Sequence, residues 1–124
     1  MTMMQLIEGS PIKFKFEDLA AGESSKAIQC NGAITRALIC VEDATTIAMT
    51  VEGCVNDTDA QGNPIDDADC NWFTLGLTSV EDFSNTTSIE ADGAFYVELS
   101  GFSRVRVSAT TLTGEPIITL VKVN

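Results

Sequence analysis

Apolar and polar residues alternate along most of this chain, and that alternation limits the possible folds more than any other feature. The alternating segments are residues 12–16, 27–30, 38–41, 45–52, 71–78, 94–99, 102–109 and 117–123. A period of two places successive side chains on opposite faces of a strand, and half-buried strands show it. The sequence therefore predicts an all-β fold of about eight short strands. We expect an antiparallel β-sandwich, of which a jelly roll is one arrangement.

The segments between the expected strands favour turns, with one long exception. Asn31 with Gly32, and Asp92 with Gly93, are pairs that tight turns prefer, because both positions tolerate positive φ. Residues 53–69 instead form a long polar, acidic connection. Loops of more than about 12–15 residues are uncommon in compact domains unless they are functional or mobile. This connection is therefore a candidate functional segment.

The length of the chain, 124 residues, suits one domain. We expect residues 1–25 to form an N-terminal arm or first strand, and residues 26–124 to form the β-sandwich domain. No apolar run approaches the ~20 residues of a membrane span, so we expect no membrane partner. The first eight residues lack a basic region, and we therefore expect no secretory leader.

Charge is distributed unevenly along the chain. Seven Lys and Arg face 18 Asp and Glu, for a net charge of −11. Thirteen of the acids lie between Arg36 and Arg104, a stretch without a single base. Such an acidic chain is repelled by phosphate backbones, which argues against a nucleic-acid partner. The acidic block has two interpretations that the sequence leaves open, namely solubility and a surface for cations or display.

The residues that most enzymes need are scarce. The chain has no histidine, and therefore no Ser-His or Cys-His pair. No nucleophile elbow or phosphate-binding glycine loop is present, and nothing in the sequence places two carboxylates in a cleft. We expect a non-enzymatic protein with no catalytic residues and no cofactor.

Four cysteines lie in the first 70 residues, and they allow three disulfide pairings. A Cys54–Cys70 bond would close the long connection at its base, and closing a loop of ~15 residues stabilises a fold by ~3 kcal/mol in the chain-entropy account. Cys30 and Cys40 would then pair with each other or with neighbouring subunits. The alternative is four reduced thiols acting as small core residues. Zinc fits poorly, because no C-x-x-C spacing and no histidine exist.

The acidic connection resembles the start of an EF-hand calcium loop at residues 57–62. The resemblance ends there, because the position of the bidentate glutamate is occupied by Ala68. We therefore expect no metal site, and keep five acids as weak calcium candidates. These are Asp57, Asp59, Asp66, Asp67 and Asp69.

Aromatic side chains on alternating strands are expected to lie in the core. They are Phe14, Phe16, Trp72, Phe73, Phe83, Phe95, Tyr96 and Phe102. Trp72 and Phe73 are adjacent, so they should point to opposite faces of their strand. We expect Trp72 to be packed and one of the two to lie outside or at an interface.

The order of these segments resembles a known family. The matching parts are residues 46–53, Trp72 with Phe73, and residues 93–97, 99–107 and 117–121. Together they are similar to a small β-sandwich domain of tailed-bacteriophage structural proteins, over about residues 45–123, and residues 99–107 are the most distinctive part. The chain departs from that pattern in its long acidic loop before Trp72 and in its four cysteines. Residues 1–44 lie outside the resemblance.

The resemblance implies a virion component without catalytic activity. The size of the chain favours a capsid decoration protein that binds the major capsid protein on the outer surface of the head, made in the cytoplasm of a bacterial host. Homo-oligomers, trimers in particular, suit the three-fold positions of a capsid. Virions meet oxidising media after lysis, where disulfides are stabilising. The alternative is a carbohydrate-binding module or an adhesion module of the tail or baseplate.

Three lysines near the start of the chain are candidates for the capsid interface. Lys13, Lys15 and Lys26 lie in the nearly neutral N-terminal region. They would face an acidic capsid surface, and the acidic loop would then face solvent.

Overall fold

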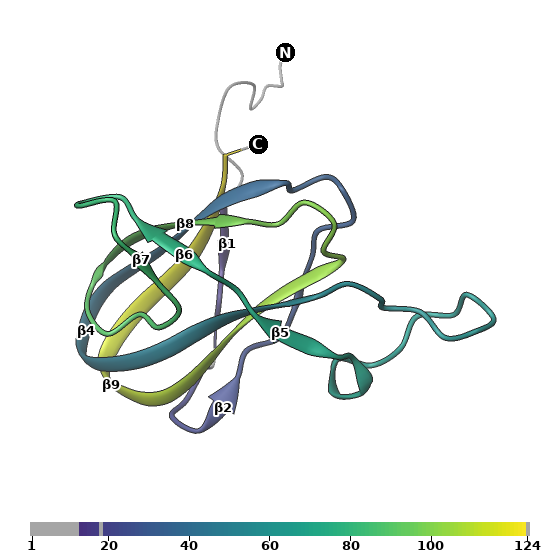
Figure 1. Cartoon of the computed structure of the whole chain (residues 1–124). Helices are drawn as coiled ribbons and strands as arrows, with labels where there is room; N and C mark the ends of the chain where they lie inside the picture. Colours follow the sequence, from purple (N-terminus) through teal and green to yellow (C-terminus); the bar gives the residue numbers. More distant parts are fainter. Residues whose placement is uncertain (1–12, 18, 124) are drawn as a thin grey trace, which may run out of the picture.

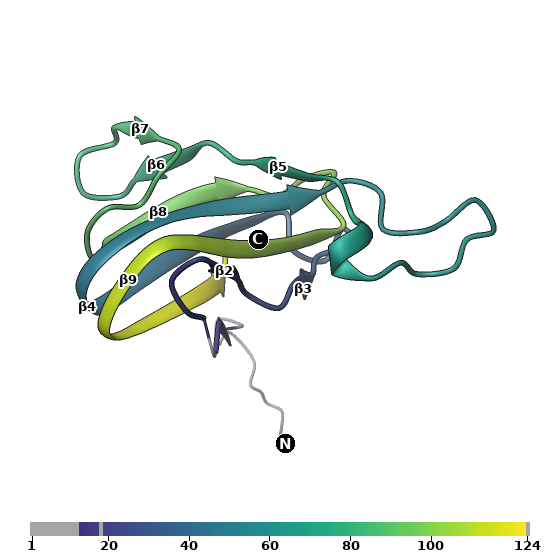
Figure 2. The ribbon, with the colours of Figure 1, turned by 90° about the horizontal axis from the view of Figure 1, so that it is seen from below.

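The structure, a computed structural model, describes residues 13–17 and 19–123, and its strands join into one antiparallel sheet (Figures 1 and 2). The strands are β1 (Lys13–Lys15), β2 (Glu23–Ser24), β3 (Ile28–Gln29), β4 (Arg36–Cys54), β5 (Trp72–Thr74), β6 (Leu77–Ser79), β7 (Asn85–Thr86), β8 (Gly93–Glu98) and β9 (Arg104–Lys122). A 3₁₀ turn, η1 (Asp67–Asp69), lies in the acidic connection. The order is β1-β9-β4-β8-β6-β7, with β2 and β3 on β9 and β5 on β4. The all-β antiparallel prediction is confirmed.

Strands β4 and β9 are 19 residues long each, and they make the sheet fold over on itself. Every second residue is buried at both ends of each strand, whereas residues 42–46 and 110–117 in their middles are mostly exposed. Both strands bend at this exposed middle, as Figure 2 shows at the left. The two halves of the paired strands therefore form the two layers of a sandwich.

The bend is held by specific main-chain contacts. Asp43 has a φ of 62°, and the pairing shifts register on both sides of Ala44. The carboxylate of Asp92 accepts hydrogen bonds from the N–H groups of Asp43 and Ala44, both at 3.1 Å. On the facing strand, Gly114 has a φ of 90°, and a Cβ there would lie 2.6 Å from Thr45 Oγ1. The bend therefore requires glycine at this position.

The core lies between the two layers and is drawn from both ends of the long strands. Its largest fully buried members are Ile39, Met49, Leu77, Ile89, Leu99, Ile118, Leu120, Val41, Val51, Val97 and Val105. In β9 the buried apolar residues carry odd numbers before the bend and even numbers after it, because the exposed middle shifts the alternation by one residue. This continuous apolar layer fixes which face of each strand points inward.

Three sequence predictions differ in detail from the structure. The segments at 38–41 and 45–52 are one strand, and so are those at 102–109 and 117–123. The segment at 71–78 is two strands, because β5 pairs with β4 whereas β6 pairs with β8. The turn at Asn31 and Gly32 is confirmed, with φ of 40° and 80°.

The N-terminal boundary stays a prediction. Residues 1–12 lie outside the described part of the chain, and β1 and β2 both pair with β9. Among residues 13–17 and 19–123, no helix has the length and hydropathy needed to cross a membrane.

Candidate functional site

Arg104 anchors the acidic connection to the sandwich. Its side chain starts from β9 and the residue is only 4% exposed. Nη1 donates a hydrogen bond to Asp67 Oδ1 at 2.8 Å, and Nη2 reaches the main-chain oxygen of Asp57 at 3.4 Å. Nε lies 3.5 Å from Asp57 Oδ2 and makes no hydrogen bond. The Asp57 carboxylate therefore interacts with Arg104 through its charge and not through a hydrogen bond. Two sides of the loop are therefore tied to one guanidinium group.

The groups around Arg104 favour its charged form. Burial lowers the pKa of a guanidinium group, but Cys70, Asp67 and Asp57 together outweigh this effect, and the pKa of Arg104 lies above its ordinary value. Burying a cation away from water costs free energy unless an opposite charge lies beside it. The ion pairs are thus a condition for burying Arg104 beneath the loop.

Cys54 and Cys70 are brought together beside this arginine. All four cysteines are free thiols in the structure, and the predicted disulfides are not formed. Arg104 Nη1 donates to Cys70 Sγ at 3.3 Å, and the Cys54 thiol donates to Asn56 O at 3.2 Å. Burial, with a smaller contribution from hydrogen bonding to Cys54, raises the pKa of Cys70 to about 11. Pairing of these neighbouring thiols stays a prediction.

Cys30 lies beside the residue that precedes β9, and Cys40 lies beside the second half of that strand. The N–H of Cys30 donates to Ser103 O at 2.7 Å, and Cys40 in β4 is paired with Thr119. Burial raises the pKa of Cys30 to about 11, and it also raises the pKa of Cys40. The protonated thiol is the stable form of both groups at neutral pH.

The five acids that the sequence offered as calcium candidates have other roles or stand apart. Asp57 and Asp67 face Arg104. Asp59 accepts hydrogen bonds from the N–H groups of Asn63 and Gln61, both at 2.9 Å, and these bonds lower its pKa. Asp66 immediately precedes the short η1 turn, and Asp69 is its last residue. Over the described residues, no three His, Cys, Asp or Glu side chains are grouped to hold a metal ion.

Trp72 ties the start of β5 to both the loop and the sheet. Its Nε1 donates to Asp67 O at 2.8 Å, and the guanidinium of Arg106 lies 4.1 Å from the centre of its ring. Arg106 also pairs with Glu52, at 2.7 Å. Trp72 is half-buried by these contacts and lies outside the core, so it does not anchor the sandwich as predicted, and the adjacent Phe73 is 53% exposed.

The expectation that the aromatic residues are core is wrong for Trp72 and for three exposed residues. Besides Phe73, Phe83 is 73% and Tyr96 is 39% exposed. Phe83 lies in the turn between β6 and β7 with a φ of 60°, which puts its ring outside the sandwich. Tyr96 lies in a shallow hollow of about 340 Å³, with Arg36, Thr78 and Glu98 around it. These three rings are free for contacts with other molecules.

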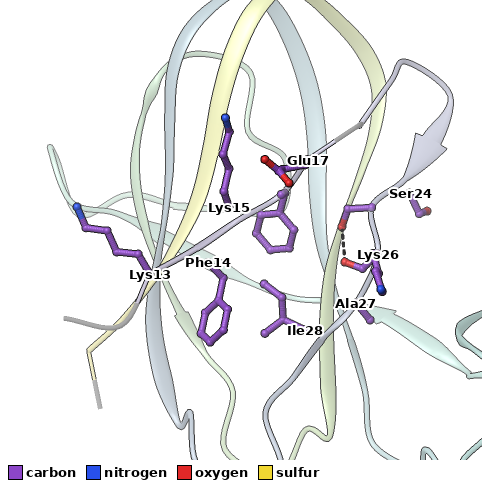
Figure 3. Close-up of a pocket in the computed structure, with 10 residues that line it drawn as sticks. Lys13, Phe14, Lys15, Glu17, Ser24, Lys26, Ala27 and Ile28 are labelled. Carbon is purple, nitrogen blue, oxygen red and sulfur yellow. Dashed lines mark hydrogen bonds between the residues drawn. The ribbon is translucent and has the colours of Figure 1, made fainter. Parts of the chain in front are cut away.

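The three lysines proposed for the capsid interface line one groove. It has a volume of about 620 Å³ and runs between β1 with Phe16 and Glu17 on one side and residues 24–28 on the other. Figure 3 shows Phe14 and Ile28 lying between the two segments, whereas the side chains of Lys13 and Lys15 extend from the opposite side of β1 to Phe14. The structure therefore brings together basic residues from two separate parts of the sequence.

Arginines and lysines differ in their pairing. Within the described part of the chain, each of the three arginines forms an ion pair with an acid, and none of the four lysines does. The exposed pair joins Arg36 to Glu98 at 2.8 Å. The lysines of the groove consequently have no ion-pair partner among the described residues.

Comparison with known proteins identifies the fold. No protein-family model matches the sequence, and no curated protein matches it either. Among solved structures, the SPBc2 prophage-derived protein YomS matches with a TM-score of 0.68 and 14% identity, over 91% of this chain and 92% of that one. The PBSX exported protein XepA matches with a TM-score of 0.67 and 15% identity, over 91% of this chain and 37% of that one. At such low identity the matches show a shared fold.

Sequence reasoning missed the role of Arg104. The residue follows the acidic block directly, at the point where the alternation of β9 begins. The sequence signal that could have indicated this role is the position of Arg104, the first basic residue after a long acidic segment. Its burial could not be foreseen, because it depends on the loop folding back over the outer face of β9.

Proposed function

We propose that this protein is a structural component of a bacteriophage virion, and specifically a capsid decoration protein that binds the major capsid protein on the outer surface of the head. The observation that carries the proposal is the structural match to a prophage-derived protein over nearly the full length of both chains. The resemblance of residues 45–123 to phage structural domains supports it independently.

The charge distribution supports an oriented attachment. The lysine-lined groove lies at β1, and the acidic loop projects from the sandwich as a separate arm in Figures 1 and 2. An acidic capsid surface would attract the first and repel the second. In this proposal the groove faces the capsid, the loop faces solvent, and copies of the chain associate as trimers at three-fold positions.

The proposed role involves no catalysis. The buried thiols of Cys30 and Cys70 have pKa values of about 11, which leaves little nucleophilic thiolate at neutral pH. Asp57 and Asp67 are engaged with Arg104. These side chains therefore serve the fold.

Co-sedimentation with the capsids of the parent phage tests the proposal. We expect the purified protein to move with empty heads in a density gradient, and a cryo-EM map of decorated heads to show it on the outer surface with residue 13 toward the capsid. Failure to bind heads, or density only on the tail, would contradict capsid decoration.

The second candidate is a carbohydrate-binding or tail adhesion module, and the hollow around Tyr96 favours it. An exposed aromatic ring flanked by Thr78 and by the Arg36–Glu98 pair provides a stacking surface with hydrogen-bonding groups at its edge. A glycan array would show saccharide binding that Tyr96→Ala abolishes and Phe73→Ala, at another exposed ring, preserves. An array without any binding would remove this candidate.

A further inference from the structure

We infer that the groove between β1 and residues 24–28 binds an extended, acidic peptide segment, which adds as a strand along β1. The inference rests on the proposed function, in which that segment belongs to the capsid protein. It goes further by assigning the attachment to one groove and by defining the chemistry of the segment that enters it.

The first support is the open edge of the sheet. β1 stands at the end of the strand order and, among the described residues, pairs only with β9. The pairing runs from Lys13 opposite Val121 to Lys15 opposite Thr119, which leaves the other edge of β1 facing the groove. An edge strand presents main-chain N–H and C=O groups to an added strand, and several peptide-binding domains use such an edge.

The second support is the apolar floor. Phe14 and Ile28 are half-buried members of the layer that packs against the core, and Phe16 beside them is buried. Successive side chains of an added strand point to opposite faces. A segment with alternating apolar and acidic residues can therefore cover the floor with one set of side chains and direct the other set to the rim.

The third support is charge. Lys13, Lys15 and Lys26 are all exposed, and Glu17 is the only acid among the described residues that line the groove. The protein as a whole carries a net charge of −11, so a long polyanion such as a nucleic acid would meet repulsion beyond the groove. A short acidic peptide would contact the three ammonium groups without extending into the acidic surface beyond the groove.

The test uses an acetylated, fluorescently labelled peptide of four Glu-Val repeats, titrated into the full-length protein and followed by anisotropy. We expect saturable binding, and a peptide of four Lys-Val repeats should not bind. The double variant Lys15→Glu with Lys26→Glu should weaken binding about tenfold, because each lost rim contact is worth up to ~1 kcal/mol. Lys122→Glu, at a lysine outside the groove, is the matched control and should change affinity less than about twofold.

Three results would overturn the inference. They are absence of binding by the Glu-Val peptide, equal weakening by Lys122→Glu, and displacement of the probe by a peptide of residues 1–12 at a lower concentration than unlabelled probe requires. The last result would assign the groove to a segment of this chain. Circular dichroism melts of each variant confirm that the fold is intact.

Gradient sedimentation with capsids separates this inference from the proposed function. If the wild-type protein binds heads and the groove double variant binds them equally well, the groove inference fails while decoration stands. If the wild-type protein does not bind heads but binds the Glu-Val peptide through the lysines, decoration fails and the groove remains a peptide site.

Discussion

The acidic loop and the lysine-lined groove carry opposite charges, and they differ in how those charges are satisfied. In the loop, Asp57 and Asp67 meet the buried Arg104, and Asp59 accepts hydrogen bonds from its own turn. In the groove, the lysines are exposed and form no ion pair within the described residues. Charges with internal partners stabilise the fold, whereas charges without them remain available to another molecule. The net charge alone does not show this difference.

The largest expected effect comes from removing the anchor of the loop. Arg104→Ala leaves Asp57 and Asp67 without their cation and opens a buried site, so we expect the free energy of unfolding to fall by about 3–5 kcal/mol. Urea denaturation measures it. Arg36→Ala is the matched control, because its pair with Glu98 is exposed and should contribute less than about 1 kcal/mol. Equal losses of unfolding free energy in the two variants would show that the buried ion pairs of Arg104 contribute no more than the exposed pair of Arg36.

Oxidation of the thiols at the base of the loop should give the next largest effect. With glutathione disulfide as oxidant, Cys54 and Cys70 form one disulfide and release two glutathione molecules, and the bond should add about 3 kcal/mol of stability by closing the loop. Because the pKa of Cys70 is about 11, the reaction should accelerate as the pH rises from 7 toward 10.

Non-reducing peptide mapping identifies the pair that forms. Cys70→Ser should abolish the gain in stability, whereas Cys40→Ser, at the half-buried thiol, should retain it. A predominant bond that involves Cys30 or Cys40 would contradict the expected pairing.

Arg106 is expected to contribute less than Arg104, because it is more exposed. Arg106→Ala removes the cation over Trp72 and leaves Glu52 unpaired, which should cost about 1–2 kcal/mol and shift the Trp72 emission to longer wavelength. Arg106→Lys keeps the charge and should restore part of the stability. An unchanged emission spectrum in Arg106→Ala would show that the stacking contact is not formed in solution.

The smallest effect is expected in the groove. Lys13→Ala, Lys15→Ala and Lys26→Ala should each change the free energy of unfolding by less than about 0.5 kcal/mol, because these side chains form no ion pair with any described residue. Thermal melts at low and physiological salt measure it. A loss above 1 kcal/mol for any one of them would mean that the groove is part of the fold rather than a free surface.

The strand content was predictable because burial of one face imposes a period of two on the sequence. The continuity of β4 and β9 was not, because residues 42–46 and 110–117 lie at the exposed bend, where the alternation is lost. A gap in the alternation of apolar and polar residues can mark either a bend within one strand or a turn between two strands. Only the register between the two strands distinguishes the two cases.

The site was predictable in its residue types but not in its pairings. The sequence singled out the acidic connection, the cysteines at its ends and the three lysines. It could not show that Asp67 would meet Arg104, which lies 37 positions later, because that contact depends on how the loop folds back. The proximity of Lys15 and Lys26 likewise follows from the placement of both segments along β9.

The two long strands have a consequence for how the molecule opens. Since β4 and β9 each run through both layers, we expect the two layers to open together. In amide hydrogen exchange, residues 37–41 and 47–53 of β4 should report one shared opening event with one free energy. Under the proposed function, each copy on the surface of the particle would then open as one cooperative unit.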